Sequence, residues 1–240
     1  PDCWREATRL AATARADLPV TGARVAAVGC GTSLYVAQAY AAWREDAGQG
    51  ETDAFPASQM PAGRQYDAVV AFSRSGTTTE VLRCLAGIHP RTRRHAVTAV
   101  AGTPIETVVD AVVRLPFADE TSLVRTRFAT TTLALIRSVL GHDMAAVIAS
   151  AAQVLSDPPA ADPADYDQFV FIGDRAGAAL AQEAGLKIRE ATGAWSEAYP
   201  AMEFRHGPIS TATKRSLVWA VGPVDPTLTD EIAETAATYI

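Results

Sequence analysis

The chain has 240 residues, 48% of them hydrophobic, which is enough for one large domain or two small ones around a buried core. Its net charge of −6 argues against nucleic acid as the main partner, because a phosphate backbone requires a basic surface. No apolar run reaches the ~18–20 residues that cross a bilayer, no signal peptide opens the chain, and the three cysteines follow no zinc-binding spacing. We therefore expect a cytoplasmic protein without disulfides, bound metal, cofactor or membrane contact.

Short apolar runs alternate with helical patterns in the first half of the chain. After an N-terminal helix, we predict strands at 24–29, 67–72, 95–100 and 111–115 and helices at 34–44 and 78–86. Continuous apolar runs of this length are typical of strands that are buried on both faces, as in parallel sheets. A long helical stretch follows at 120–155, and we expect a break in it near Gly141-His142-Asp143.

The pattern then stops and restarts. Asp157-Pro158-Pro159-Ala160-Ala161-Asp162-Pro163 is too rich in proline for a helix and indicates a linker. Beyond it we predict strands at 168–173 and 217–221, a helix at 176–191 and a helix-like run at 229–237. This alternation predicts an α/β fold with right-handed crossovers. We divide the chain into a first domain at 1–156, a linker at 157–164 and a second, incomplete domain at 165–240. In each domain a strand ends in glycine and leads into a helix, which hints at an internal duplication.

The first candidate motif, Gly29-Cys30-Gly31-Thr32-Ser33, follows the first strand. Loops at the carboxyl ends of parallel strands are where such sheets bind ligands. Leu34 occupies the third glycine position of G-x-G-x-x-G, which excludes a dinucleotide site. Two interpretations remain open, ligand binding by the loop and simple capping of the helix by Ser33.

The second motif, Ser73-Arg74-Ser75-Gly76-Thr77-Thr78-Thr79-Glu80, follows another buried strand. Five of its first seven residues carry a hydroxyl group, far more than one helix cap needs. Hydroxyls and free N–H groups at a helix start suit the oxygens of a phosphate. No Lys-Ser/Thr pair follows the glycine, so this is not a P-loop. We favour phosphate binding over a plain capped loop.

The third motif runs from Lys187 through Glu190 to His206-Gly207-Pro208. Lys187 and Glu190 are three residues apart and share a helix face. A carboxylate, a lysine and a histidine could supply a base, a charge stabiliser and an acid. From spacing alone, a solvated helix face with an ordinary salt bridge is the stronger interpretation.

Together the three motifs resemble the sugar isomerase (SIS) domain family, and most closely its members with two such domains. The segments 29–33, 73–78 and 187–208 are similar to its G-C-G-T-S loop, its S-x-S-G-x-T phosphate loop and its K-x-x-E … H-G-P segment. The segment 120–127 resembles the family's link between a loop and a long helix. The resemblance implies two flavodoxin-like domains, each with a parallel sheet of about five strands flanked by helices.

The resemblance also implies how a sugar phosphate would be held. It assigns the phosphate to the hydroxyls of the second motif, with help from the first loop and from the linking segment. The substrate-binding residues it implies are Cys30, Gly31, Thr32, Ser33, Ser73, Arg74, Ser75, Thr78, Leu123 and Arg125.

The catalytic residues implied by the resemblance are Glu190, His206 and Lys187. Glu190 would move a proton between C1 and C2 of a hexose 6-phosphate, His206 would assist ring opening from a neighbouring subunit, and Lys187 would stabilise negative charge. The implied protein is a homodimer that isomerises an amino-sugar phosphate, with or without deamination, and needs no cofactor. The alternative is a non-catalytic sugar-phosphate-binding regulator.

The sequence departs from the family pattern at two positions. Thr77 stands where the family often has glutamate, and Arg125 replaces a small hydroxyl residue in the linking segment. We find neither the glutaminase domain nor the C-terminal lysine tail that the glutamine-dependent synthases of this family carry. Glutamine-dependent synthesis is therefore not expected.

Overall fold

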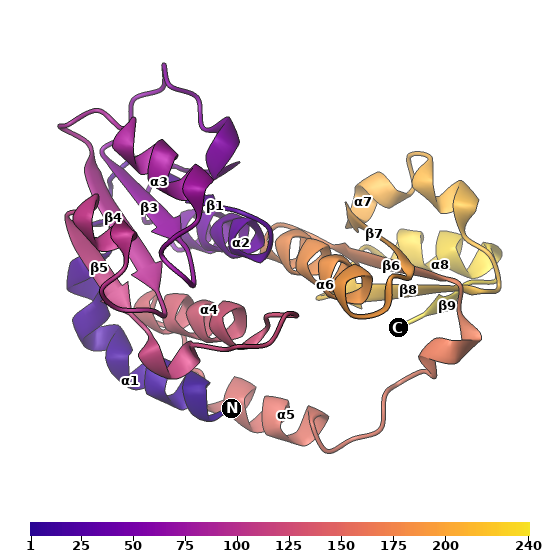
Figure 1. Cartoon of the computed structure of the whole chain (residues 1–240). Helices are drawn as coiled ribbons and strands as arrows, with labels where there is room; N and C mark the ends of the chain where they lie inside the picture. The colour runs from indigo at the N-terminus through magenta and orange to yellow at the C-terminus, as the bar shows by residue number, and fades with distance from the viewer. The chain divides into compact units, whose positions relative to one another are not determined.

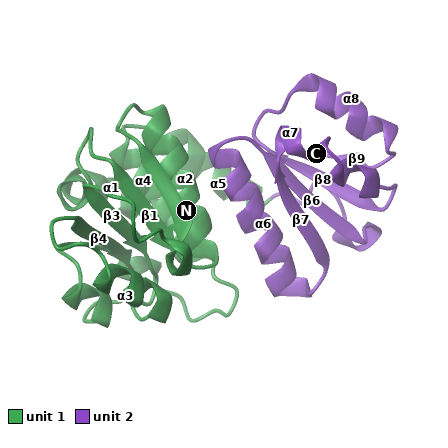
Figure 2. Cartoon of the chain, turned by 90° about the horizontal axis from the view of Figure 1, so that it is seen from above, with its two compact units in different colours: residues 1–156 green, residues 157–240 purple.

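The computed structural model describes residues 1–240 and divides them into two compact units, 1–156 and 157–240. Figure 2 colours the two units separately. Each unit is built on its own parallel sheet with helices on both faces. The predicted α/β class with two parallel sheets is confirmed.

Unit 1 alternates strands and helices along most of its length (Figure 1). Its strands are β1 (Val25–Gly29), β2 (Thr52–Pro56), β3 (Ala68–Phe72), β4 (Arg93–Thr98) and β5 (Ala111–Arg114). Its helices are α1 (Asp2–Ala14), α2 (Thr32–Asp46), α3 (Thr79–Ala86), α4 (Arg127–Val139) and α5 (Ala145–Val154).

The five strands of unit 1 lie in the order β2-β1-β3-β4-β5, and every pairing is parallel. This is the flavodoxin-like order, in which the chain changes direction across the sheet between β1 and β3. The two strands are direct neighbours, with Val28 beside Ala71. Their carboxyl ends, and the loops that follow them, therefore lie side by side.

Alternating side chains of the central strands form two separate cores. Val25 and Ala27 of β1 pack in the core that α1, α2 and α4 cover. Ala26 and Val28 face the other way, into the core beneath α3. The helices that follow β1 and β3 thus cover opposite faces of the sheet, so the loops after these two strands lie at the topological switch point, where such sheets bind ligands.

The helical stretch predicted at 120–155 was given too early a first residue, but its break lies where we expected it. Helix α4 begins only at Arg127, and the break falls between Val139 and Ala145. The reason for the late start is Glu120, whose buried carboxylate accepts hydrogen bonds from the N–H groups of Thr126, Arg127 and Phe128 at 3.0–3.2 Å. The carboxylate thus satisfies the first N–H groups of a helix that begins seven residues later, and Glu120 itself lies outside that helix.

Strand β4 covers 93–98 rather than the predicted 95–100. The pairing of β4 with β3 ends before Ala99, because the N–H of Ala99 bonds at 3.0 Å to the carbonyl of Arg74, which lies in the loop after β3. At the other end the strand begins with two arginines, which an apolar pattern does not reveal.

Unit 2 has four strands, one fewer than the resemblance implies. They are β6 (Gln168–Gly173), β7 (Trp195–Pro200), β8 (Ser216–Val221) and β9 (Thr238–Tyr239), all parallel in the order β7-β6-β8-β9. Its helices are α6 (Ala176–Thr192), α7 (Ala201–Phe204) and α8 (Pro226–Glu234). The core on one face lies under α6, and the core on the other lies under α7 and α8. Residues 157–162 form neither helix nor strand.

Candidate functional site

The loop after β1 does not use Ser33 as a cap. Helix α2 begins at Thr32, its N-cap is Gly31, and no side chain caps it. Ser33 lies in the first turn of α2, so the capping interpretation is wrong. Gly31 has a φ of +54°, and a Cβ there would meet open space. Bare backbone therefore faces outward at the start of α2.

The loop after β3 is a dense set of hydroxyl groups. The hydroxyls of Ser73 and Thr78 lie 3.3 Å apart, and Ser73 is buried. The Ser75 hydroxyl accepts bonds from the Thr77 N–H at 3.3 Å and the Thr77 hydroxyl at 2.9 Å. As it accepts both, its own hydrogen remains available to donate. Thr78 is the N-cap of α3 but makes no capping bond, so these hydroxyls do not serve as a plain helix cap.

A tight turn holds this hydroxyl loop in shape. Gly76 has a φ of +62°, and a Cβ at this position would collide with the side chains of Thr103 and Ile105. The Gly76 carbonyl also accepts a bond from the N–H of Ile105 at 3.1 Å. The turn therefore requires glycine, both for its backbone conformation and for its close packing.

Arg74 is turned away from these hydroxyls toward the linking segment. Its guanidinium donates to the Asp119 carboxylate at 2.6 Å and to the Glu120 carbonyl at 3.3 Å. This pair keeps the pKa of Asp119 below its usual range, with a smaller contribution from Arg125. The structure thus joins the loop after β3 to the segment before α4, and it places Arg74 as a connection between them.

The linking segment is fixed at its start and its end. Asp119 holds one end through Arg74, and the Glu120 carboxylate at the N-terminus of α4 holds the other. Between them, Leu123 is 89% exposed. Nη1 of Arg125 is buried and has no hydrogen-bond partner. Asp119 was not among the predicted site residues, because its role depends on a contact 45 residues away.

In unit 2, Lys187 lies between two carboxylates on one face of α6. Its Nζ is 2.5 Å from Glu190 and 3.5 Å from Glu183, and its side chain is only 17% exposed. This is more shielded than an ordinary solvated salt bridge. Glu183 was not among the predicted site residues, although its position four residues before Lys187 on a predicted helix indicates this contact.

His206 lies apart from Glu190 within this unit. Glu190 is in the last turn of α6, which leads to the amino end of β7, and His206 follows the carboxyl end of that strand. A six-residue strand spans about 17 Å. The neighbouring Arg205 pairs with Glu231, and His206 itself is exposed. One copy of unit 2 therefore does not bring the predicted base and acid together.

The loop after β6 copies the backbone of the loop after β1. Arg175 has a φ of +52° and a ψ of −118°, against +54° and −129° at Gly31. Each residue is the N-cap of the following helix. A Cβ on the preceding strand-end glycine, Gly29 or Gly173, would collide with backbone four residues further on in both loops. This match supports the internal duplication at which the sequence hints.

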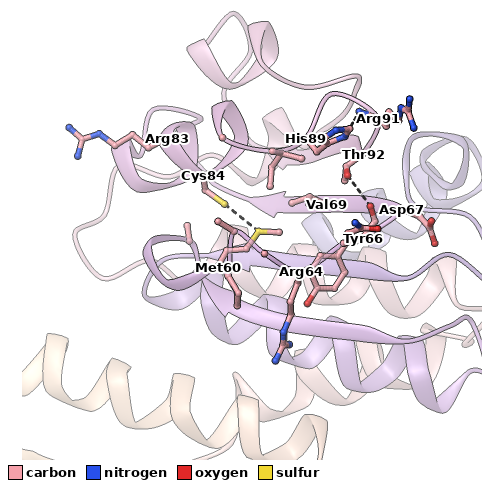
Figure 3. A pocket seen from close by; sticks show the side chains of 17 residues that line it. Met60, Arg64, Tyr66, Asp67, Val69, Arg83, Cys84, His89, Arg91 and Thr92 are labelled. Carbon is pink, nitrogen blue, oxygen red and sulfur yellow. Dashed lines mark hydrogen bonds between the residues drawn. The ribbon is translucent and has the colours of Figure 1, made fainter.

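A cavity of about 660 Å³ in unit 1 lies away from the predicted site. It is lined by the segments that lead into β3 and β4, at the amino ends of these strands. Figure 3 shows Met60 and Cys84 in contact at its centre, at 3.5 Å, with Arg64 and Arg83 extending away from it. The charged groups do not converge on one point, and the two candidate loops of unit 1, 29–33 and 73–78, lie at the opposite edge of its sheet.

No group of three or more histidine, cysteine, aspartate or glutamate side chains is placed to hold a metal ion. All three cysteines are free thiols. No helix combines the length and the apolar character needed to cross a bilayer.

No protein-family model matches the chain. Among curated proteins, it is 25% identical over 230 residues to the glutamine–fructose-6-phosphate aminotransferase (isomerizing) of Thermotoga maritima. The alignment covers 84% of this chain but only 38% of that enzyme. The chain therefore spans well under half the length of this relative.

Solved structures with the same fold align over nearly the whole chain. Glucosamine-6-phosphate deaminase from Thermotoga maritima superposes with a TM-score of 0.78 at 23% identity, covering 100% of this chain and 82% of its own. Tagatose-6-phosphate ketose/aldose isomerase from Escherichia coli gives 0.82 at 18% identity, with 98% and 74% covered. At such identities the likeness establishes the fold, and function has to be argued from the site.

Proposed function

We propose that this chain binds a hexose 6-phosphate and isomerises its open-chain form by proton transfer between C1 and C2. The observation that carries the proposal is the meeting of two motifs at one place. The loops 29–33 and 73–78 are far apart in sequence, yet they follow neighbouring strands at the switch point of the sheet. Relatives and structural neighbours that act on sugar phosphates support the same substrate class.

The phosphate would sit on the loop after β3. Ser75 has a hydrogen left to donate, and the first turn of α3 adds N–H groups and a positive dipole end. Phosphate takes no part in the reaction, but its binding energy holds the reacting carbons still.

Glu190 would be the base of the proton transfer. Removing a proton next to a carbonyl or imine leaves negative charge, which a nearby cation stabilises. Lys187 is such a cation, 2.5 Å from the Glu190 carboxylate. We include amino-sugar phosphates among the substrates, with deamination as a possible outcome of the same transfer.

The sharpest test of the chemistry is solvent-deuterium exchange at C1 or C2 of the sugar. Glu190→Gln keeps the size of the side chain and removes its basicity. It should bind sugar phosphate nearly as the wild type does and lose on the order of 10²–10⁴ in exchange rate. Glu234→Gln, an exposed glutamate on α8, is the matched control and should exchange normally. Equal rates for the Glu190→Gln variant and the wild type would exclude this base.

Phosphate binding is tested separately by calorimetric titration. Ser75→Ala should weaken binding by about 1–3 kcal/mol, because a charge-assisted hydrogen bond is lost. Thr79→Ala, which removes an exposed hydroxyl of the same helix start, should have little effect. If wild-type protein binds hexose 6-phosphates yet exchanges no carbon-bound proton, the non-catalytic regulator becomes the better proposal.

We also propose that active sites form between two copies of the chain. The motivation is the separation of Glu190 and His206 along β7. Mixing Glu190→Gln with His206→Ala should then restore activity, up to about a quarter of the wild-type value for random dimers with one intact site in each mixed dimer. No recovery after subunit exchange, or an active monomer by light scattering, would contradict shared sites.

A further inference from the structure

Arg125 lies in the linking segment, where the resemblance given above implies a small hydroxyl residue and this chain has a long cation. Its Nη1 is buried and has no hydrogen-bond partner, although a buried N–H without an acceptor is unfavourable. The molecule therefore has an unsatisfied donor in the very segment that is expected to contact the sugar.

The surroundings of Arg125 carry a surplus of positive charge. Arg74 and Arg125 both lie within electrostatic range of Asp119, so one carboxylate serves two cations. Arg127 approaches the same residue but donates to its backbone carbonyl at 3.0 Å. The other nearby carboxylate, Glu120, is engaged by three N–H groups at the start of α4. Arg125 therefore shares the Asp119 carboxylate with Arg74, which holds the hydrogen bond to it.

The segment that carries Arg125 has few restraints on its backbone. Residues 121–125 make no backbone hydrogen bonds of the kind that fix a turn, and Leu123 between them is 89% exposed. The segment is held only at its ends, through Asp119 and Glu120. A small rearrangement can therefore bring the guanidinium to a ligand.

We infer that Arg125 selects a sugar phosphate that bears a second anionic group, a carboxylate or a second phosphate. The first anion would bind the loop after β3, and Arg125 would take the second. This inference rests on the proposed function, because it assumes that a sugar phosphate occupies the site. Planar guanidinium groups bind both kinds of anion through paired hydrogen bonds.

The experiment compares affinities for four probes, measured by calorimetry on the full chain. Fructose 6-phosphate carries one anion. Fructose 1,6-bisphosphate adds a phosphate, whereas 6-phosphogluconate and the glycine adduct of fructose 6-phosphate add a carboxylate. The wild type should prefer at least one of the last three over fructose 6-phosphate by about 10- to 100-fold. Which probe is preferred identifies the second anion and its position.

Arg125→Ser introduces a small hydroxyl at this position. It should abolish the preference, so that the two-anion probes bind no more tightly than fructose 6-phosphate, while Arg125→Lys should keep part of the preference. Arg83→Ser, which removes an exposed arginine elsewhere in unit 1, is the matched control and should keep all of it.

Two results would overturn the inference while leaving the proposed function intact. One is wild-type protein that binds fructose 6-phosphate as tightly as every two-anion probe. The other is an Arg125→Ser protein that loses the same factor for all four probes. Binding of none of the probes by wild-type protein would overturn the proposed function and this inference together.

Discussion

Glu120 offers the most direct test of the interactions that hold the predicted site together. Its carboxylate bonds to three N–H groups at the start of α4, and Phe128, which provides one of them, is buried. In Glu120→Ala, water can replace the carboxylate at Thr126 and Arg127, which are exposed, but not at Phe128. The cost is one buried N–H without a partner, about 1–3 kcal/mol, plus about 0.5–1 kcal/mol for the lost charge at the helix dipole.

We therefore expect Glu120→Ala to destabilise unit 1 by about 1.5–4 kcal/mol, or roughly 3–16 °C in its melting temperature. Urea unfolding followed by tryptophan fluorescence measures this, because the indole of Trp4 donates to Thr130 on α4 at 3.1 Å. Glu80→Ala is the matched control, an exposed glutamate in the first turn of α3, and should cost only about 0.3–1 kcal/mol. If the two variants unfold within about 0.5 kcal/mol of each other, the precision of such measurements, the capping role of Glu120 is refuted.

Three further predictions concern the fold of unit 1. His95 is buried, and burial lowers its pKa below the unfolded value of 6.5. The free energy of unfolding should therefore be highest above pH 6.5 and should decrease as the pH falls below this value. Urea unfolding of His95→Gln should depend less on pH than that of the wild type. Burial raises the pKa of the Cys84 thiol to about 11, so iodoacetamide at about pH 7.5 should label it on the order of 10²-fold more slowly than free cysteine, and equal rates by mass spectrometry would contradict this. Gly76→Ala should lower the free energy of unfolding by at least ~2 kcal/mol, because the strain of a positive φ adds to the collision of the new Cβ with its neighbours. Gly48→Ala, at a φ of +65° with open space around it, should lower it by about 1 kcal/mol.

The sequence predicts the central strands well because these are buried on both faces. Every residue of β1, β3 and β6 is buried, and each strand stands out as a continuous apolar run. The edge strands β2 and β7 were missed. Their sequences, TDAFP and WSEAYP, are only partly buried, mix polar with apolar residues and end in proline. Their strand conformation comes from pairing with a neighbour, which local sequence does not encode.

The candidate site could be predicted only where its residues are close in sequence. The hydroxyl loop and the Lys187–Glu190 pair were found because their members lie within one turn or one loop. The bond from Arg74 to Asp119 and the capping of α4 by Glu120 were not, because both depend on how the chain folds back on itself. The Ser33 cap was a sound local expectation, and the backbone conformation of Gly31 displaced it.

The matching loops at Gly31 and Arg175 show how one scaffold can diverge. Glycine adopts this backbone, with positive φ and negative ψ, without strain, whereas arginine does so at a cost of about 1–3 kcal/mol. The first copy keeps an uncovered amide surface, which any anion of suitable shape can approach. The second places a charged side chain, that of Arg175, at the corresponding point. The two loops differ at every one of the four positions after the strand-end glycine, so the second copy has lost both the bare backbone and the hydroxyls of the first while the path of the main chain is kept.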